Sequence, residues 1–246
     1  MNEFLQLFGI YFAVCLGSYL LGSIPVGLII SKRLKGIDIN KIGSGNIGGT
    51  NVGRKLGFKY GVLVVGLDAC KGALPVILFT HFFWYSWWMV GLAWLFAVLG
   101  NIFPVWLKFK GGKGVSVFIG GLLAFLNWHV FLVILGCWIV IFLFFTKRKM
   151  SAANLMLASG ILVFILMLPV LLYIAPIILL LIALLWWSHR ENLKRLARGE
   201  EPSLSLPPFL SFLNKLPDDI IGLIVEKLQS FIKTLQKYQS EKKPRE

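Results

Sequence analysis

Long apolar runs separated by short polar loops are the feature that most constrains the fold of this chain. The runs span residues 4–31, 59–107, 115–146 and 151–187. A helix needs roughly 20 apolar residues to cross the hydrocarbon core of a bilayer, so each run is long enough to cross at least once. Only 15% of the residues are charged and the mean hydropathy is +0.79, whereas soluble domains carry about 25% charged residues. The sequence therefore predicts an all-α polytopic membrane protein.

The placement of basic residues predicts how often the chain crosses the membrane. Lysine and arginine gather on the cytoplasmic side of bacterial inner membranes. A single helix between Lys113 and Lys147 would leave basic residues on both sides, and the same holds for residues 71–108 and 149–190. Each of the three later runs is therefore expected to be a helical hairpin, with turns near residues 81–86, 127–129 and Pro169. Together with the first helix, which Pro25 should kink, this gives seven transmembrane helices, with the N-terminus outside and the C-terminus in the cytoplasm.

The chain is expected to divide into three parts. Residues 1–201 form the membrane unit, and residues 202–216, which include Pro207 and Pro208, form a linker or a surface-lying segment. From residue 217 to 246, apolar residues recur every three or four positions with lysines between them, which is typical of an amphipathic helix. This helix is expected on the inner leaflet, with packing against a partner helix as the alternative.

Three polar loops, all expected on the cytoplasmic side, are candidate anion sites. The first is a glycine-rich stretch of short donors from Gly43 to Arg54. Glycine can turn backbone N–H groups toward an anion because it tolerates positive φ, and arginine presents a planar fork that suits phosphate. The second, residues 108–114, has three lysines and three glycines before a helix start, where N–H groups favour anions. One such loop is by default a connector, but three on one side favour a shared site.

The third loop, residues 189–201, adds candidates for acid–base chemistry. His189 is the only histidine expected on the inner side, since His81 and His129 fall in outer turns. Asn192 lies three residues later and therefore shares its helix face. A lone histidine at a helix end is more often structural, but its position beside two candidate anion loops favours a catalytic role.

Other reactive groups are interpreted as structural. Asp68 and Lys71 lie three apart in an apolar run and are expected to form an ion pair inside the bundle. The cysteines Cys15, Cys70 and Cys137 lie in separate apolar runs and are expected to be buried thiols. No His, Cys, Asp or Glu cluster has metal-site spacing, so no metal is predicted. The net charge of +14 is better explained by topology and by attraction to anionic lipid and substrates than by nucleic acid.

Together, the three loops resemble those of the bacterial acyl-phosphate:glycerol-3-phosphate acyltransferases, membrane enzymes that begin phospholipid synthesis. The resemblance covers residues 1–201, and three spaced motifs in a seven-helix context are highly specific. Asp68, Lys71, Gly72 and Ser151 also match family positions. The motifs read Gly43-Ser44-Gly45-Asn46 with Thr50-Asn51 and Arg54, then Lys110-Gly111-Gly112-Lys113-Gly114-Val115, then His189-Arg190-Glu191-Asn192-Leu193-Lys194-Arg195-Leu196 with Gly199-Glu200.

The resemblance implies transfer of an acyl group from acyl phosphate to the sn-1 hydroxyl of glycerol 3-phosphate, on the cytoplasmic face of the inner membrane. The products would be lysophosphatidic acid and phosphate. Acyl phosphate is already an activated anhydride, so no metal, cofactor or covalent nucleophile is needed, and catalysis can rest on positioning two anions and removing a proton. The expected catalytic residues are Ser44, His189 and Asn192, and the expected substrate-binding residues are Arg54, Lys113, Ser151, Asn46, Thr50, Asn51, Gly111, Gly112 and Gly114.

Within this set, each part has an expected role. The loop from Gly111 to Gly114 should hold the phosphate of acyl phosphate, while Arg54 and Lys113 should bind glycerol 3-phosphate with help from Ser151. The sequence leaves open whether a histidine or the substrate's own phosphate takes the hydroxyl proton.

Two positions depart from the family pattern, and two other functions are alternatives. Gly49 stands where the family usually has alanine, and Asn101 where it often has histidine, so the role of Asn101 is open. The tail beyond Leu204 lies outside the resemblance. A transporter or channel for an anionic solute would use Asp68 and Lys71 as a relay, but transporters often carry internal repeats and none is evident. An interaction scaffold would explain only the tail.

Overall fold

The part of the chain described by the computed structural model comprises residues 2–81, 86–126, 128–146, 148–166, 173–204 and 230. The chain divides into two units, Met1–Leu204 and Ser205–Glu246. Apart from residue 230, the second unit, with the expected amphipathic helix, lies outside the described residues. The described elements are all helices: α1 (Asn2–Ser23), α2 (Val26–Lys35), η1 (Ile39–Lys41), α3 (Gly49–Leu56), α4 (Phe58–His81), α5 (Trp87–Ile102), η2 (Val105–Leu107), α6 (Val115–Phe125), α7 (Trp128–Val140), the π-helical turn η3 (Ile141–Phe145), α8 (Met150–Leu166), α9 (Ala175–Ser188) and α10 (Arg190–Ala197).

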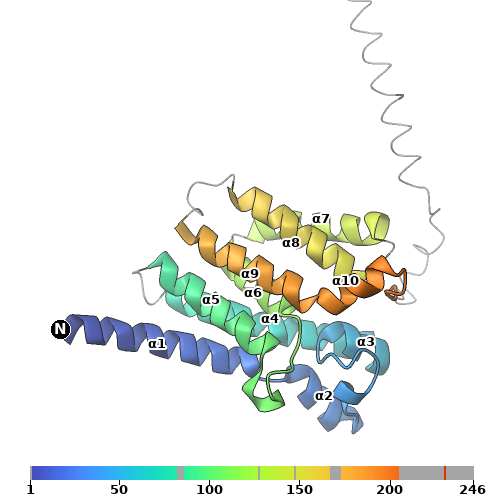
Figure 1. The fold of residues 1–246 in the computed structure, drawn as a ribbon, viewed down its shortest axis with the longest axis horizontal. Helices are drawn as coiled ribbons and strands as arrows, with labels where there is room; N and C mark the ends of the chain where they lie inside the picture. Colours follow the sequence, from blue (N-terminus) through green and yellow to red (C-terminus); the bar gives the residue numbers. More distant parts are fainter. Residues whose placement is uncertain are drawn as a thin grey trace, which may run out of the picture. The chain divides into compact units, whose positions relative to one another are not determined.

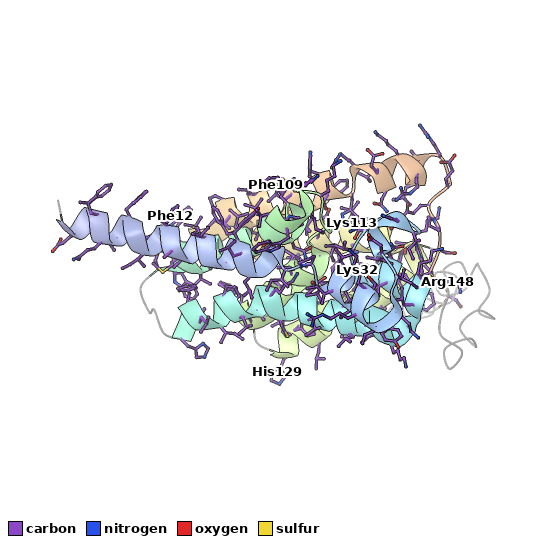
Figure 2. All side chains as sticks on the ribbon, turned by 90° about the horizontal axis from the view of Figure 1, so that it is seen from below. Phe12, Lys32, Phe109, Lys113, His129 and Arg148 are labelled. Carbon is purple, nitrogen blue, oxygen red and sulfur yellow. The ribbon has the colours of Figure 1, made fainter. Side chains whose placement is uncertain are left out.

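The long helices of the first unit lie side by side along one common direction, and α2, α3 and α10 gather at the end opposite the N-terminus (Figure 1). Figure 2 shows Lys32, Lys113 and Arg148 toward this same end, away from Phe12 on α1. In the described part of the chain, three stretches are long and apolar enough to cross a membrane, Glu3–Lys35, Phe58–His81 and Trp87–Leu107. Four shorter apolar helices accompany them: Val115–Phe125, His129–Phe145, Met150–Leu162 and Ala175–Ser188.

The interruptions predicted from the sequence fall where helices end. Helix α4 ends at His81 and α5 begins at Trp87. Helix α6 ends at Phe125 and α7 begins at Trp128, so this break comes about two residues before the turn expected at residues 127–129. Pro25 separates α1 from α2, because proline has no N–H to continue a helix, so the expected kink is a full break. The turn expected at Pro169 lies outside the described residues, between α8 and α9.

A buried ion pair on α4 contacts the break after α1. Nζ of Lys71 lies 2.7 Å from Oδ1 of Asp68, which confirms the predicted pair, and both side chains are buried. The same ammonium donates to the backbone carbonyls of Gly22, at 3.1 Å, and Ile24, at 2.8 Å. Regular helical hydrogen bonding stops at the break, and an unpaired buried carbonyl is costly. Lys71 therefore stabilises the irregular backbone beside Pro25.

Close packing of α4 against α6 fixes the helix that follows the second polar loop. A Cβ at Gly72 of α4 would overlap the backbone of Val117 on α6, and one at Gly120 of α6 would overlap α4. Small residues of this kind let membrane helices approach closely. The aromatic core lies alongside, where Trp94 of α5 stacks on Phe118 of α6 with ring centroids 5.1 Å apart. The helices on either side of the loop are thereby held together.

One expectation about the cysteines was wrong. The side chains of Cys70 on α4 and Cys137 on α7 are exposed, and Cys15 is only partly buried. Exposed apolar neighbours such as Leu74 and Val133 share these helices. Because lipid is as apolar as a protein core, a membrane helix can be apolar all round. Apolar sequence around a cysteine therefore does not indicate burial here.

Candidate active site

The first polar loop is folded around the side chain of Asn51. Its Oδ1 accepts the Ser44 N–H at 3.2 Å, and its Nδ2 donates to the backbone oxygens of Ile42, at 3.0 Å, and Asn46, at 2.9 Å. The side chain of Asn46 in turn accepts the Gly48 N–H at 2.8 Å, just before α3 begins. Both asparagines, predicted to bind substrate, thus hold the loop in shape, while Ser44 stays exposed.

Helix α3 carries Thr50 in its first turn and Arg54 in its last turn, and Arg54 reaches the end of the third loop. Its Nη2 donates to the Pro202 carbonyl at 3.1 Å, and its Nε is buried with no partner among the described residues. Burial lowers the pKa of Arg54, with Glu201 opposing the shift and Arg195 adding to it. An arginine remains charged at neutral pH even so, and it keeps an N–H for a further acceptor.

The second loop is tied to helices on both sides. The backbone N–H groups of Gly111, Gly112 and Gly114 all donate to oxygens at the end of α5. On the other side, the Ser188 hydroxyl at the end of α9 donates to the Lys113 carbonyl at 3.0 Å. The three glycine N–H groups expected to hold a phosphate are therefore engaged within the protein, and Lys113 is held between two helices.

Glu201 lies at the centre of the charged cluster, and reasoning from the sequence missed it. Its carboxylate accepts hydrogen bonds from the Ser151 hydroxyl, from Nδ2 of Asn192 at 2.7 Å, and from Nε of Arg195 at 2.9 Å. Desolvation by itself would raise the pKa of Glu201, but these hydrogen bonds and the charge of Arg195 outweigh it and lower the pKa. The sequence offered a partial signal, since acidic residues end the third motif, but did not show that Glu200 is exposed and Glu201 buried.

Lys113 is the cation most affected by this environment. Burial lowers the pKa of Lys113 to about 8, the negative charge of Glu201 opposes the shift, and the positive charges of Arg195 and Arg54 add to it. Lys113 therefore remains mostly protonated at pH 7. Cations from all three loops act on one small region, which is an arrangement suited to anions with more than one charge.

His189 is fully buried and presents one ring nitrogen without a partner. Its Nδ1 lies 2.8 Å from the Leu185 carbonyl, and since a carbonyl only accepts, the hydrogen bond assigns the proton to Nδ1 and leaves a lone pair on Nε2. Nε2 is buried and has no partner among the described residues. Burial, followed by the charge of Lys113, lowers the pKa of His189 to about 4. The neutral ring can thus accept a hydrogen bond from a ligand.

An apolar groove adjoins the polar cluster, between α6, α8 and α9. Two of its lining residues connect it to the cluster. The carbonyl of Leu185 binds His189, and Asn154 lies one helical turn after Ser151. The groove is lined by Val115, Phe118, Ile119, Asn154, Leu157, Ala158, Ile161 and Leu185.

The structure brings five of the twelve predicted site residues together around Glu201. Arg54, Lys113, Ser151, His189 and Asn192 all interact with Glu201, directly or through its charge. Among the described contacts, Arg54 is the one predicted residue of the first loop that is joined to this cluster. A direct part in the site for the serine, threonine and asparagines of that loop therefore stays a prediction.

The apolar helices and the cation-rich polar cluster define an integral membrane protein with a charged site at one end of a helical bundle. The family model for glycerol-3-phosphate acyltransferase matches residues 12–199, and the chain belongs to this family of enzymes. The glycerol-3-phosphate acyltransferase of Prochlorococcus marinus (strain NATL1A) is 37% identical to it, and the match covers 77% of this chain and 96% of the relative. That of Rhodopseudomonas palustris (strain HaA2) is 43% identical, over 81% of this chain and 98% of the relative.

Solved structures agree with this assignment. One match is the crystal structure of PlsY, an integral membrane glycerol 3-phosphate acyltransferase, in its glycerol 3-phosphate form. Its sequence is 37% identical to this chain, the TM-score is 0.73, and the match covers 79% of this chain and 96% of that one. The lysophosphatidic acid form matches with a TM-score of 0.72 over 79% and 95% of the two chains. The family resemblance identified from the three loops is confirmed.

Proposed function

We propose that this protein transfers a fatty acyl group from acyl phosphate to the sn-1 hydroxyl of glycerol 3-phosphate, releasing lysophosphatidic acid and phosphate. The observation that carries the proposal is the convergence of Arg54, Lys113 and Arg195, from three separate loops. They lie near Nε2 of His189, which has no partner in the described part of the chain. The glycerol 3-phosphate and lysophosphatidic acid forms of PlsY support the same acceptor and product.

The proposed mechanism begins with the two anionic groups. Arg54 and Lys113 bind the phosphate of glycerol 3-phosphate, beside Ser151 and Asn192, which Glu201 holds in place, and the two cations offset the repulsion of this phosphate from acyl phosphate. The acyl phosphate is held at the start of α6, which follows the Gly111–Gly114 loop, because the N–H groups of a first helical turn favour an anion. Holding both reactants in place supplies much of the rate enhancement.

His189 is proposed to orient the attacking hydroxyl through Nε2. With a pKa of about 4, the ring accepts a hydrogen bond at pH 7 but holds a proton weakly. A phosphate group has a second pKa near 6, so the leaving phosphate is the better final proton acceptor. We therefore assign hydrogen bonding to His189 and the proton to phosphate. Ser44 and the first loop complete the positioning of acyl phosphate.

The part of the acyl chain nearest its carbonyl is proposed to lie in the small apolar groove between α6, α8 and α9. Its lining is apolar except for Asn154, and burial of a methylene group stabilises binding by about 0.8 kcal/mol. One end of the groove adjoins the polar cluster through Leu185 and His189. This route places the carbonyl carbon of an acyl phosphate near the hydroxyl that attacks it.

We propose seven membrane crossings, with the N-terminus outside and the three motif loops in the cytoplasm of a bacterial cell, at its inner membrane. Three long and four shorter apolar helices among the described residues support this number. The test introduces single cysteines into a variant without native cysteines and adds a membrane-impermeant thiol reagent. A cysteine at Lys149 should react only from the inside, and a cysteine at Ser86 only from the outside. Labelling of both from one side would contradict the topology.

The activity test uses purified protein in detergent with glycerol 3-phosphate and three alternative donors, acyl phosphate, acyl-CoA and acyl-carrier protein. Phosphate release and lysophosphatidic acid should appear with acyl phosphate. Transfer from another donor alone would show the donor assignment to be wrong. No transfer from any donor, together with anion flux in proteoliposomes, would favour the transport alternative.

Residues 205–246 are proposed to lie outside the catalytic unit, as a linker followed by an amphipathic helix from residue 217. Residues 202–204 belong with the membrane unit, since Pro202 binds Arg54 and the Leu204 N–H donates to the Arg148 carbonyl at 2.9 Å. A chain truncated after Leu204 should retain the chemistry while losing some stability or lipid dependence. A folded but inactive truncated protein would show that the tail is part of the site.

A further inference from the structure

The end of α5 holds the second loop through one residue, Asn101. Its side-chain Oδ1 accepts the Gly114 N–H at 3.1 Å, and its backbone carbonyl accepts the Gly112 N–H at 2.9 Å. Asn101 is 5% exposed, and the hydrogen bond to Gly114 is buried. These two glycines flank Lys113. The lysine is therefore attached to α5 on both sides by bonds to the same asparagine.

The glycines of the loop fit closely against Asn101. A Cβ at Gly112 would lie 2.7 Å from Oδ1 of Asn101, and one at Gly111 would overlap the Asn101 carbonyl and the Pro104 ring. Gly114 has φ +77, a conformation that side chains rarely adopt. The glycines are thus explained by contact with α5, rather than by exposure of N–H groups to a ligand.

The end of α5 is itself fixed. The Tyr19 hydroxyl of α1 donates to the Phe103 carbonyl at 2.7 Å, and Gly100 packs directly on the backbone of α1. Across the loop, Ser188 donates to the Lys113 carbonyl. Asn101 therefore presents its acceptors from an immobile helix end, and the backbone of Lys113 is held from two directions.

We propose that Asn101 is a positioning residue for glycerol 3-phosphate, because it sets the place of Lys113 by holding Gly112 and Gly114. The inference rests on the proposed function. Without Oδ1 the buried Gly114 N–H has no acceptor, and leaving a buried donor unpaired is unfavourable. The loop avoids this by moving its N–H groups toward water, which carries Lys113 away from the anion it binds.

The test compares Asn101→Leu with Asn101→His. Leucine has nearly the shape of asparagine but no acceptor, whereas Nδ1 of histidine stands as many bonds from the backbone as Oδ1 and can accept the Gly114 N–H. Asn101→Leu should raise KM for glycerol 3-phosphate about tenfold, equivalent to about 1.4 kcal/mol, and should change KM for acyl phosphate much less. Asn101→His should restore most of the affinity.

Ser159→Ala is the control, since it removes a side-chain to backbone hydrogen bond, from the Ser159 hydroxyl to the Leu155 carbonyl, within α8 and away from the second loop. It should leave KM for glycerol 3-phosphate near the unmodified value. If Asn101→Leu cannot be purified folded, Asn101→Ala replaces it, because the smaller side chain adds no overlap. The rise in melting temperature on adding glycerol 3-phosphate gives a second readout that needs no turnover.

The possible failures are distinguishable. An unmodified protein without acyl transfer would overturn the proposed function. An active unmodified protein whose Asn101→Leu variant keeps its KM, or loses affinity for both substrates equally, would overturn the inference alone. So would an Asn101→His variant as impaired as Asn101→Leu.

Discussion

Replacing Glu201 by glutamine removes a negative charge from the middle of the cation cluster with little change in shape. Oε1 accepts from Ser151 and Asn192, and Oε2 accepts from Arg195. The amide oxygen of glutamine can keep the first two hydrogen bonds, but its NH₂ group would face the guanidinium, donor against donor. The variant therefore tests the charge of Glu201 rather than its volume.

The size of the effect follows from these contacts. A hydrogen bond to a charged group contributes about 1.5–3 kcal/mol, but the Arg195 side chain is 37% exposed, so water reduces its loss to about 1 kcal/mol. The two retained hydrogen bonds lose their charge assistance, which roughly halves them and costs about 1 kcal/mol for each. The free energy of unfolding should therefore fall by about 3 kcal/mol.

Unfolding in detergent measures this directly, with Glu200→Gln as the control. That substitution makes the same change of charge at the exposed neighbouring residue and should change stability by less than about 0.5 kcal/mol.

The pH dependence of glycerol 3-phosphate affinity gives a second readout. Lys113 binds an anion as an ammonium, which is lost as the pH rises through its pKa of about 8. The charge of Glu201 raises the pKa of Lys113. In Glu201→Gln the loss of affinity that accompanies rising pH should therefore begin at a lower pH than in the unmodified protein.

Two results would refute this reasoning. If Glu201→Gln unfolds like Glu200→Gln, the carboxylate is not the anion that holds the cluster together. If stability falls but the pH dependence of affinity stays unchanged, Glu201 stabilises the third loop without acting on Lys113.

Three other predictions concern single side chains. Arg54→Ala should raise KM for glycerol 3-phosphate roughly 10- to 100-fold, the value of a charged hydrogen bond, and equal rises for both substrates would remove its assignment to the acceptor. Lys71→Met should destabilise the fold by about 3–5 kcal/mol because it leaves Asp68 buried and unpaired, and Asp68→Leu in the same chain should recover part of this in thermal unfolding. The pKa of His189 is about 4 in the folded protein and about 6.5 when unfolded, so the unfolded state binds the extra proton first as the pH falls. Stability should therefore drop by about 3 kcal/mol between pH 6.5 and 4, and His189→Gln should lack this component in unfolding titrations.

The sequence predicted the helices and their interruptions because those depend on local composition. Pro25 has no N–H to continue a helix and stands at a break, whereas Pro75 lies inside α4 without ending it. The polar residues near position 81 end an apolar run. The pair of Asp68 and Lys71 was also predictable, since residues three apart on a helix share a face. Apolar character did not distinguish a lipid-facing cysteine such as Cys70 from a buried one.

The site was predicted only in part, because its central contacts join distant positions. Glu201 binds Ser151 across 50 residues, and no periodic pattern carries that pairing. Asn51 was expected to bind substrate, yet its side chain is engaged with its own loop. The loop from Gly111 to Gly114 was expected to hold a phosphate, and no sequence pattern indicated that the Asn101 side chain accepts one of its N–H groups.

The contact of Lys71 with the break after α1 has a consequence for how the chain enters the membrane. The carbonyls of Gly22 and Ile24 belong to the apolar segment that precedes α4 in the chain, and their ammonium partner is synthesised about 50 residues later. Until α4 is inserted, the irregular backbone at Pro25 must find other donors, such as water at the bilayer surface. We therefore expect the segment Glu3–Lys35 and α4 to reach their final depth as a pair, once Lys71 has been synthesised and can donate to the two carbonyls.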